Sequence, residues 1–212
     1  MDTHSDDERS ILANGGPGAL GELFSQHRDR LERIIAFRLD PGIRSRVDAA
    51  DVLQEAYLEI ARRLPEFLRA ENVSFFVWIR GRTLQTLVDV HRRHFRERRD
   101  ANREIRLHDR IGGQDTSLSI ARFLIDELTS PSQAAVQAEE VRSLQEALNA
   151  MNETDREVLA LRHFEQLTNN QVAEILGLSV TAASNRYLRA AARLGEILKH
   201  RSLGSISRGP RQ

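Results

Sequence analysis

The segment TNNQVAEILGLSVTAASNRYLRAAARLGEIL, residues 168–198, decides the fold of the C-terminal half of the chain. Thr168 and Gln171 have the spacing of a capping box, in which two side chains satisfy free backbone N–H groups at the start of a helix. Gly177 can take the left-handed conformation that ends this helix, and Ser179 can cap the next one. The segment therefore predicts a helix-turn-helix.

The second of these helices is amphipathic and carries arginines on its polar side. Its apolar stripe consists of Val180, Ala183, Tyr187, Ala191, Leu194 and Leu198. The opposite and flanking faces carry Thr181, Ser184, Asn185, Arg186, Arg189 and Arg193. Amide and guanidinium groups can reach base edges in a major groove, whereas hydroxyls and further arginines can hold phosphates. These polar residues are our candidates for contact with duplex DNA.

The distribution of charge supports this interpretation. The whole chain has 31 basic and 31 acidic residues, so its net charge alone predicts no nucleic-acid partner. After Thr181, however, Glu196 is the single acid among seven basic residues, which are Arg186, Arg189, Arg193, Lys199, Arg201, Arg208 and Arg211. A plain helical hairpin with a solvated basic face is the alternative. The segregated charge favours DNA binding.

Composition limits the class of protein. A chain of 212 residues with 40% hydrophobic residues can bury one large or two small cores. It has no cysteine, which excludes disulfides and thiolate metal sites and is compatible with a reducing cytoplasm. No apolar run approaches the length of a membrane span or signal-peptide core, so we expect a soluble, cytoplasmic protein without a membrane partner. Few segments alternate as strands do, which favours an all-α fold.

The periodicity divides the chain into five segments. We expect a flexible leader at residues 1–18 and a helical domain at 19–99. A flexible linker follows at 100–129, although SLSIARFLIDEL within it could form one short helix. A second helical domain, which contains the helix-turn-helix, occupies 130–200, and a flexible tail occupies 201–212. The predicted fold class is therefore all-α, with two helical domains joined by a flexible linker.

Local signals place the other helices. In the first domain, one helix spans residues 19–39, a second begins at an Asp48 cap and closes at Pro65, and a third begins near Ser74. In the second domain, a helix begins at a cap formed by residues 130–133. Another begins where Thr154 precedes Glu157, which is again capping-box spacing.

Two separated motifs resemble one family. DVLQEAYLEIARRL from Asp51, followed by SFFVWIRGRTLQTLVDVHRRH from Ser74, resembles region 2 of bacterial sigma-70-type RNA polymerase sigma factors. Residues 141–198 resemble region 4, and a chain with only these two regions resembles the extracytoplasmic-function (ECF) group. The resemblance covers roughly residues 19–198. It implies a promoter-specificity subunit that binds core RNA polymerase, directs it to two promoter elements and helps to melt the downstream one.

The first motif implies a surface for core RNA polymerase. The family's D-x-x-Q-E pattern matches Asp51, Gln54 and Glu55, and in the family this surface docks on the clamp helices of the largest catalytic subunit. Glu59 lies one helical turn after Glu55, so Asp51, Gln54, Glu55 and Glu59 can form an acidic and amide stripe beside a buried face. Without the motif, an ordinary solvated helix face would be the better interpretation.

The second motif implies contact with downstream promoter DNA. The F-x-x-W-I pattern matches Phe75, Trp78 and Ile79, and in the family this helix and the loop before it hold the downstream element as a single strand. An unpaired strand requires a cationic track and pockets for extruded bases. We interpret the aromatic residues as core. The candidate DNA contacts are Asn72, Arg80, Arg82, Arg92, Arg93 and Arg96.

In region 4, residues 184–190 resemble the family's K-S-R-L-x-R-A pattern, which implies that this helix reads the upstream promoter element. Thr181-Ala182-Ala183 replaces the family's usual G-T-V, so the bases that it reads are not predicted. Members of the ECF group are often held by an anti-sigma protein, which adds one possible partner.

Other classes of protein fit less well. His91 and His94 form an i,i+3 pair but lack a third ligand, and the chain has no H-E-x-x-H, phosphate-binding glycine loop or G-x-S-x-G. We therefore expect no enzyme, cofactor, metal or small-molecule substrate. A freestanding helix-turn-helix regulator accounts for the C-terminal half equally well, but not for the stripe at Asp51 or the basic helix at 80–99. A module that binds only proteins is the third hypothesis.

Overall fold

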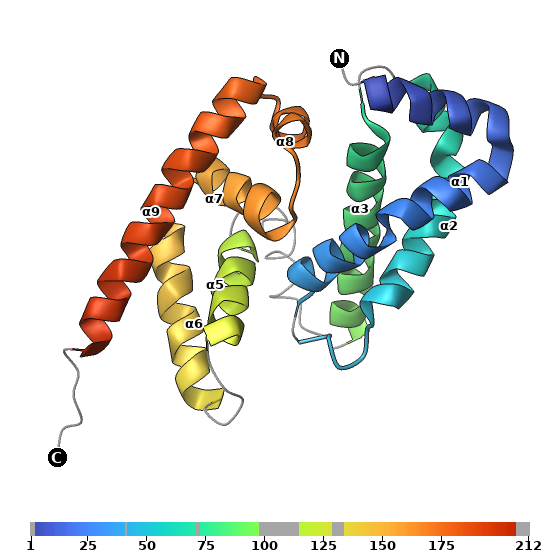
Figure 1. Ribbon diagram of the computed structural model, residues 1–212. Coiled ribbons are helices and arrows are strands. Elements are labelled where there is room, and N and C mark those ends of the chain that lie inside the picture. Colours follow the sequence, from blue (N-terminus) through green and yellow to red (C-terminus); the bar gives the residue numbers. More distant parts are fainter. Residues whose placement is uncertain (1–2, 41, 71–72, 98–114, 129–133, 207–212) are drawn as a thin grey trace. The chain divides into compact units, whose positions relative to one another are not determined.

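The computed structural model describes residues 3–40, 42–70, 73–97, 115–128 and 134–206, shown in colour in Figure 1. For residues 3–6, 17, 95–97, 115, 126–128, 134–136 and 201–206 it describes the backbone alone. All regular secondary structure in these ranges is helical, which confirms the predicted all-α class. The chain forms two compact units, residues 1–108 and 109–212. None of the described helices combines the length and apolar character that crossing a membrane requires.

The N-terminal unit consists of α1 (Thr3–Arg38), α2 (Ala49–Arg69) and α3 (Phe75–Glu97), which pack on one another (Figure 1). Each helix contributes an apolar face to one core. The fully buried side chains of this core include Leu31, Ile34, Ile35, Ala56, Ile60, Phe67, Phe75 and Ile79. The hairpin of α2 and α3 carries both motifs that the sequence singled out in this unit.

Helix α1 begins much earlier than the sequence predicts. Residues 3–15, part of the expected flexible leader, form a helical arm that meets the rest of α1 at a kink, where Gly16 has a φ of 61°. Glycine adopts positive φ at little cost, so the chain changes direction here. Leu12 on the arm is only 2% exposed, and its burial explains why the arm is ordered.

Arg9 attaches this N-terminal arm to the end of α2. Its Nη1 donates to the carbonyl oxygens of Phe67 and Ala70, each at 2.6 Å, and its Nη2 donates to that of Val73 at 2.9 Å. The guanidinium carbon also lies 4.3 Å from the ring centre of Phe67. The last carbonyls of a helix have no partner within the helix and carry partial negative charge, so a cation is stabilising there.

The two ends of α2 show one correct and one wrong prediction. The side chain of Asp48 accepts a hydrogen bond from the backbone N–H of Ala50 at 3.1 Å, which confirms the predicted cap. Pro65 does not close the helix, which continues to Arg69. Proline removes one backbone hydrogen bond, but Phe67 beyond it is fully buried and its ring lies 5.1 Å from that of Trp78. Burial of this ring offsets the loss.

The C-terminal unit contains five α-helices and one π-helical segment within the described residues. They are α5 (Asp115–Leu128), α6 (Ala134–Asn149), α7 (Glu153–Leu159), the π-helical segment Ala160–Phe164, α8 (Asn169–Leu176) and α9 (Val180–Ile206). Helix α5 packs mainly on α6, and α9 packs on α7 and α8. The core includes Ile120, Leu144, Leu148, Val158, Leu161, Leu167, Val172, Ala183 and Ala190.

Helix α5 occupies much of the segment predicted as a linker. Ile120 and Ala121 are fully buried, and the Thr116 hydroxyl donates to Glu157 of α7 at 2.8 Å. This part of the segment therefore belongs to the C-terminal unit. Residues 98–114 and 129–133, with the predicted cap at 130–133, lie outside the described residues. The backbone of α9 continues as helix to Ile206, into the expected tail, whose residues 207–212 are also outside them.

The turn between α6 and α7 depends on polar side chains. Asn152, rather than the predicted Thr154, is the N-cap of α7 and accepts from the backbone N–H of Thr154 at 2.9 Å. Arg156 is 8% exposed, and its Nη1 donates to the carbonyl oxygens of Leu148 and Asn149 at the end of α6 and of Met151 in the turn that follows, with the shortest contact, 2.5 Å, to Met151. The Arg156 guanidinium thus provides donors for carbonyl oxygens at the C-terminal end of α6 and in the turn after it.

Replacing Arg9 by alanine should destabilise the N-terminal unit by about 2 kcal/mol, because three charge-assisted hydrogen bonds to backbone carbonyls are lost. Trp78 is the single tryptophan of the chain, so urea unfolding followed by its fluorescence reports on this unit. Arg69→Ala removes an exposed arginine near the same helix end and should change stability by less than about 0.5 kcal/mol. Equal midpoints for Arg9→Ala and wild type would contradict the proposed attachment.

Candidate docking and nucleic-acid interfaces

The helix-turn-helix forms as its cap residues predict. The Thr168 hydroxyl accepts from the backbone N–H of Gln171 at 3.2 Å, and the Gln171 side chain accepts from the N–H of Thr168 at 3.1 Å. Gly177 ends α8 in the left-handed conformation, with φ 62° and ψ 34°. The Ser179 hydroxyl then accepts from the N–H of Ala182 at 3.1 Å at the start of α9. These local interactions determine the angle at which α9 leaves the turn.

The buried stripe of α9 differs in part from the predicted one. Ala183, Ala190 and Leu194 form its centre, and their spacing of seven and four residues keeps them on one face. Val180, predicted to lie in the stripe, is 46% exposed because it occupies the first position of α9, beyond the region that α8 covers. The described side chains of α9 outside the stripe are those that a partner can reach.

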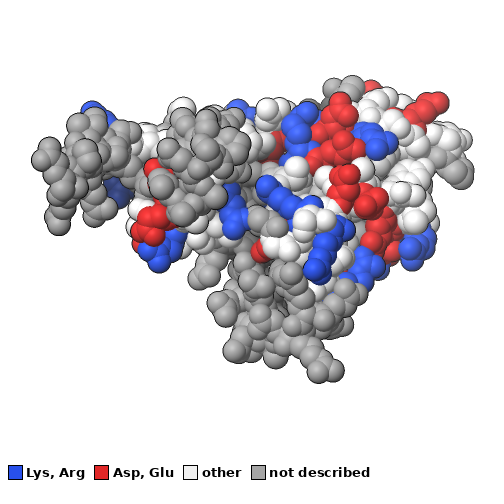
Figure 2. Space-filling view, turned by 90° about the horizontal axis from the view of Figure 1, so that it is seen from below, with Lys and Arg blue, Asp and Glu red and all other residues white. Residues whose placement is uncertain are grey.

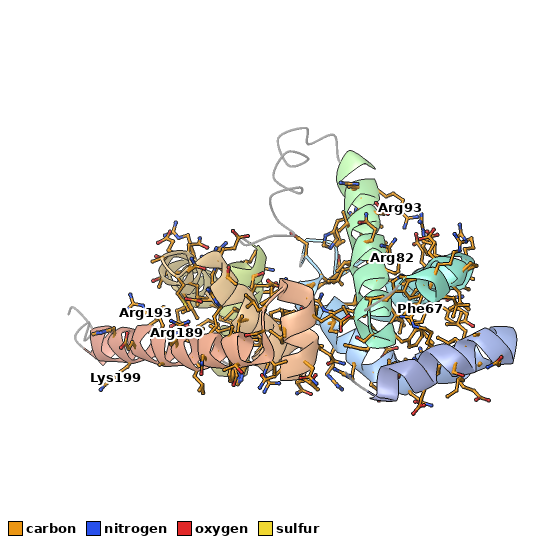
Figure 3. The ribbon with its side chains drawn as sticks, turned by 90° about the horizontal axis from the view of Figure 1, so that it is seen from above. Phe67, Arg82, Arg93, Arg189, Arg193 and Lys199 are labelled. Atoms are coloured by element: carbon orange, nitrogen blue, oxygen red, sulfur yellow. The ribbon has the colours of Figure 1, made fainter. Side chains whose placement is uncertain are left out.

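The predicted DNA contacts divide into two groups. Thr181, Asn185 and Arg189 are exposed, and Ser184 is half-buried. Arg193 pairs with Glu196 at 2.9 Å at the surface. In Figure 3, Arg189, Arg193 and Lys199 follow one another along α9. Exposed amide, hydroxyl and guanidinium groups on one helix suit a major groove.

Arg186 has a different position from the other candidates. Its Nη1 donates to Oδ1 of Asp155 at 3.0 Å, and both side chains are about two-thirds covered, with 30% and 31% exposed. This ion pair connects α9 to α7. Arg186 therefore helps to hold α9 within its own unit. No sequence pattern connects Asp155 with a residue 31 positions later.

Leu188 is an exposed residue of α9 that the sequence analysis did not single out. Its side chain is 62% exposed, and it lies three residues after Asn185 and four after Ser184. Residues at these intervals share one helix face. An apolar group on a surface that reads DNA can contact the methyl group of thymine.

In the N-terminal unit, Asp51 and Gln54 form the open part of the predicted polymerase stripe. Both side chains are exposed, and they line a shallow pocket of about 290 Å³ with Phe24 and Tyr57, whose ring centres lie 5.0 Å apart. Within the described residues, neither side chain forms a hydrogen bond or an ion pair with another residue. Their polar groups are therefore available to a partner.

Glu55 and Glu59 are paired within their own unit. Both carboxylate oxygens of Glu55 accept from Nη2 of Arg93 on α3, at 2.6 and 2.8 Å. Glu59 accepts a hydrogen bond from Arg63 and lies 3.4 Å from Arg62. The hydrogen bond from Arg63 lowers the pKa of Glu59, and the positive charges of its arginine neighbours act in the same direction. The stripe thus has an open part and a neutralised part.

The arginines predicted to hold single-stranded DNA lie in different environments. Arg80 is only 6% exposed, so its guanidinium is not on an open surface. Arg82 is half-buried, Arg92 lies 3.6 Å from Asp89, and Arg93 is bound to Glu55. Asn72 and the side chain of Arg96 lie outside the described residues. In Figure 2, acidic and basic side chains are interleaved over the N-terminal unit, in the right half of the view.

Comparison with known proteins identifies the family. The model for "Sigma-70, region 4" matches residues 142–194. The chain is 33% identical over 142 residues to the probable RNA polymerase sigma factor RfaY of Xanthomonas campestris pv. campestris, which covers 67% of this chain and 32% of that protein. This confirms the chain as a member of the sigma-70 family.

Further comparisons agree with this membership. The chain is 26% identical over 182 residues to the ECF RNA polymerase sigma factor SigE of Mycolicibacterium smegmatis, which covers 85% of this chain and 62% of that protein. The chain thus spans about a third of the length of RfaY and less than two thirds of SigE. The structure of CnrH in complex with the cytosolic domain of CnrY matches with a TM-score of 0.50 and 20% identity, over 92% of this chain and 97% of that chain. This likeness concerns the fold.

Aromatic and histidine side chains have structural roles in the N-terminal unit. Phe75 and Phe76 are 0% and 2% exposed, so this sigma-70 family member uses them as core, as predicted. His91 accepts from the backbone N–H of Asp40 at 3.3 Å, which gives it a structural role. Within the described residues there is no group of three or more side chains that could hold a metal ion.

The effect of Arg63 on the pKa of Glu59 can be tested by titration. A carboxylate whose pKa is lowered on folding stabilises the fold above the ordinary glutamate pKa, and this contribution is lost as the pH falls through the lowered pKa. In a ¹³C NMR titration of the Glu59 carboxyl carbon, Arg63→Gln should raise the midpoint towards the ordinary glutamate value. Arg62→Gln removes the longer, 3.4 Å contact and should raise it less. An unchanged midpoint in Arg63→Gln would exclude Arg63 as the cause.

Proposed function

We propose that this protein is an RNA polymerase sigma factor, which binds core RNA polymerase and confers promoter recognition and melting in transcription initiation. The observation that carries this proposal is the presence, in one chain, of a region 4 helix-turn-helix and an open Asp51 and Gln54 surface within a region 2-like motif. The curated relatives bear the names of sigma factors.

The C-terminal unit is proposed to bind the upstream promoter element as duplex DNA. Helix α9 would enter the major groove with the face that carries Thr181, Asn185, Leu188 and Arg189, all of which are exposed. Asparagine can form two hydrogen bonds with adenine, and arginine two with guanine. Ser184 and Arg193 lie at the flanks and suit phosphates, while Arg186 would act mainly by holding α9 on α7 through Asp155.

The N-terminal unit is proposed to bind core polymerase and the melted downstream element. Within the part of the chain that the structure describes, Asp51 and Gln54 are the exposed and unpaired contacts for a basic partner surface. Glu55 and Glu59, which are paired with arginines, extend this contact surface. On α3, Arg82, Arg92 and Arg93 are the described candidates for the phosphates of a single strand, to which Asn72 and Arg96 would add. Arg80 is buried and would support the helix instead of contacting DNA.

The proposed role involves binding alone. No covalent step is proposed, and neither a cofactor nor a small-molecule substrate is needed to deliver polymerase to a promoter. Bacterial transcription takes place in the cytoplasm, so that location follows from the role. An anti-sigma protein is a further proposed partner, since the similar CnrH was solved with the cytosolic domain of another protein.

A freestanding helix-turn-helix regulator is the alternative function. It is favoured by the same α8 and α9 geometry but gives no role to the open Asp51 and Gln54 surface. A single reading helix without a partner also binds duplex weakly. Binding to core polymerase separates the two functions.

The double variant Asp51→Arg/Gln54→Ala should bind purified bacterial core polymerase roughly thirtyfold more weakly than wild type, because a positive charge then faces a basic partner surface. The measurement is the fluorescence anisotropy of labelled protein titrated with core polymerase. Gln26→Ala/Asp29→Arg makes the same changes at two exposed α1 positions of equal spacing and should bind like wild type. Failure of folded wild-type protein to bind core polymerase would exclude the sigma-factor proposal.

Arg189→Ala should weaken binding of the polymerase complex to its preferred upstream element by about 1–3 kcal/mol and reduce discrimination between bases at one position. Lys199→Ala, which removes an exposed charge farther along α9, should weaken binding uniformly across sequences and reduce the salt dependence by about one unit. Competition binding with a panel of single-base variants distinguishes these patterns. Equal losses on all sequences for Arg189→Ala would assign this residue to phosphate.

A further inference from the structure

One ion pair joins residues that are proposed to bind two different partners. Glu55 belongs to the polymerase stripe on α2, and Arg93 belongs to the DNA candidates on α3. Nη2 of Arg93 lies 2.6 and 2.8 Å from the two carboxylate oxygens of Glu55. The side chains remain 44% and 56% exposed, so molecules in solution can reach both.

The helical hairpin explains why these residues meet. Helices α2 and α3 run antiparallel and pack on each other (Figure 1), so the beginning of α2 lies beside the end of α3. Arg82 and Arg93 are eleven residues apart, which is about three helical turns, and so lie on one side of α3. Figure 3 shows both on the side of α3 that faces α2. Glu55 and Glu59 are likewise one turn apart on α2.

Glu59, the next acid of the stripe after Glu55, also lies near an arginine of α3. The pKa of Glu59 is lowered first by the hydrogen bond from Arg63, but the positive charge of Arg82 also contributes. The carboxylates of the stripe and the arginines of α3 thus partly neutralise each other.

An exposed ion pair of this kind is weak enough to be exchanged. Pairs between solvent-exposed side chains are typically worth less than about 1 kcal/mol, so a basic protein surface or a phosphate can replace one member. Arginine stays charged throughout. When Glu55 binds a cationic partner, Arg93 loses its counter-charge and becomes available to an anion.

We propose that Glu55 holds Arg93 in the free protein, and that docking of a basic polymerase surface on Glu55 releases Arg93 to bind the phosphates of single-stranded DNA. This inference rests on the proposed function. Glu55 is then a positioning residue for DNA binding as well as a docking residue. Because linkage is reciprocal, DNA that takes Arg93 strengthens docking at Glu55 by the same factor.

The test uses the full chain without polymerase and a short fluorescein-labelled single-stranded oligodeoxynucleotide of mixed sequence, over a series of salt concentrations. Glu55→Gln removes the charge that holds Arg93 but keeps the size of the side chain. It should bind the oligonucleotide about two- to fivefold more tightly than wild type, since an exposed pair has been removed. One additional phosphate contact should also make the slope of log K against log salt steeper by about 0.7.

Two variants control for the change in net charge. Glu32→Gln removes the same charge from another exposed ion pair of this unit, with Arg28 of α1 at 2.9 Å, and should leave the salt slope unchanged. Glu55→Gln/Arg93→Gln should lose the gain of Glu55→Gln, because the released arginine is absent. Thermal unfolding by circular dichroism verifies that all variants fold.

The outcomes separate this inference from the proposed function. A Glu55→Gln variant with the salt slope of wild type, or a gain that persists in the double variant, would overturn the role of Arg93. Core polymerase binding of the wild type is measured in parallel. Polymerase binding without the Glu55→Gln gain would leave the sigma-factor function standing and remove the coupling. A gain without polymerase binding would support the restraint on Arg93 and refute its release by polymerase.

Discussion

The burial of Phe67 determines much of the N-terminal unit. The ring lies against those of Phe75 and Trp78, at 5.5 and 5.1 Å, and this contact keeps α2 helical beyond Pro65. Because α2 extends to this point, its last carbonyls lie where Arg9 of the N-terminal arm can bind them. The same packing of α2 on α3 places Glu55 beside Arg93. The packing of Phe67 thus supports both the attachment of the N-terminal arm through Arg9 and the ion pair between Glu55 and Arg93.

The features that the sequence predicts best depend on residues within four positions of one another. The caps at Asp48, Thr168 and Ser179 and the left-handed Gly177 are all of this kind. Most of the wrong or incomplete predictions concern residues whose conformation depends on distant packing. The N-cap of α7, which is Asn152 and not Thr154, is a local exception. The arm before Gly16 is ordered by burial that no local pattern reveals. For α5, the sequence indicates a short helix at residues 117–128 but not its burial in the C-terminal unit. Short-range hydrogen bonds can be read from spacing, whereas burial requires the assembled fold.

In the candidate interfaces, too, local spacing predicts some features, whereas others depend on how the helices pack. Spacing and motif predict which faces of α2, α3 and α9 carry polar groups, and the exposure of Asp51, Gln54 and Asn185 agrees with that prediction. The sequence did not reveal which charges are already neutralised. Glu55 and Arg93 are 38 residues apart, and Asp155 and Arg186 are 31 apart. Charge pairs at such separations depend on how helices pack, so a count of arginines overstates the number available to DNA.

The attachment of the N-terminal arm has a consequence for synthesis of the chain. The three hydrogen bonds of Arg9 join residues separated by 58, 61 and 64 positions. The turns of this arm therefore cannot reach their final partners until α2 and the residues up to Val73 have also been synthesised. Because closing such a long loop is entropically unfavourable, the N-terminal unit is expected to fold late and as a whole. A nascent chain that ends before Val73 would lack one of the three carbonyl partners of Arg9.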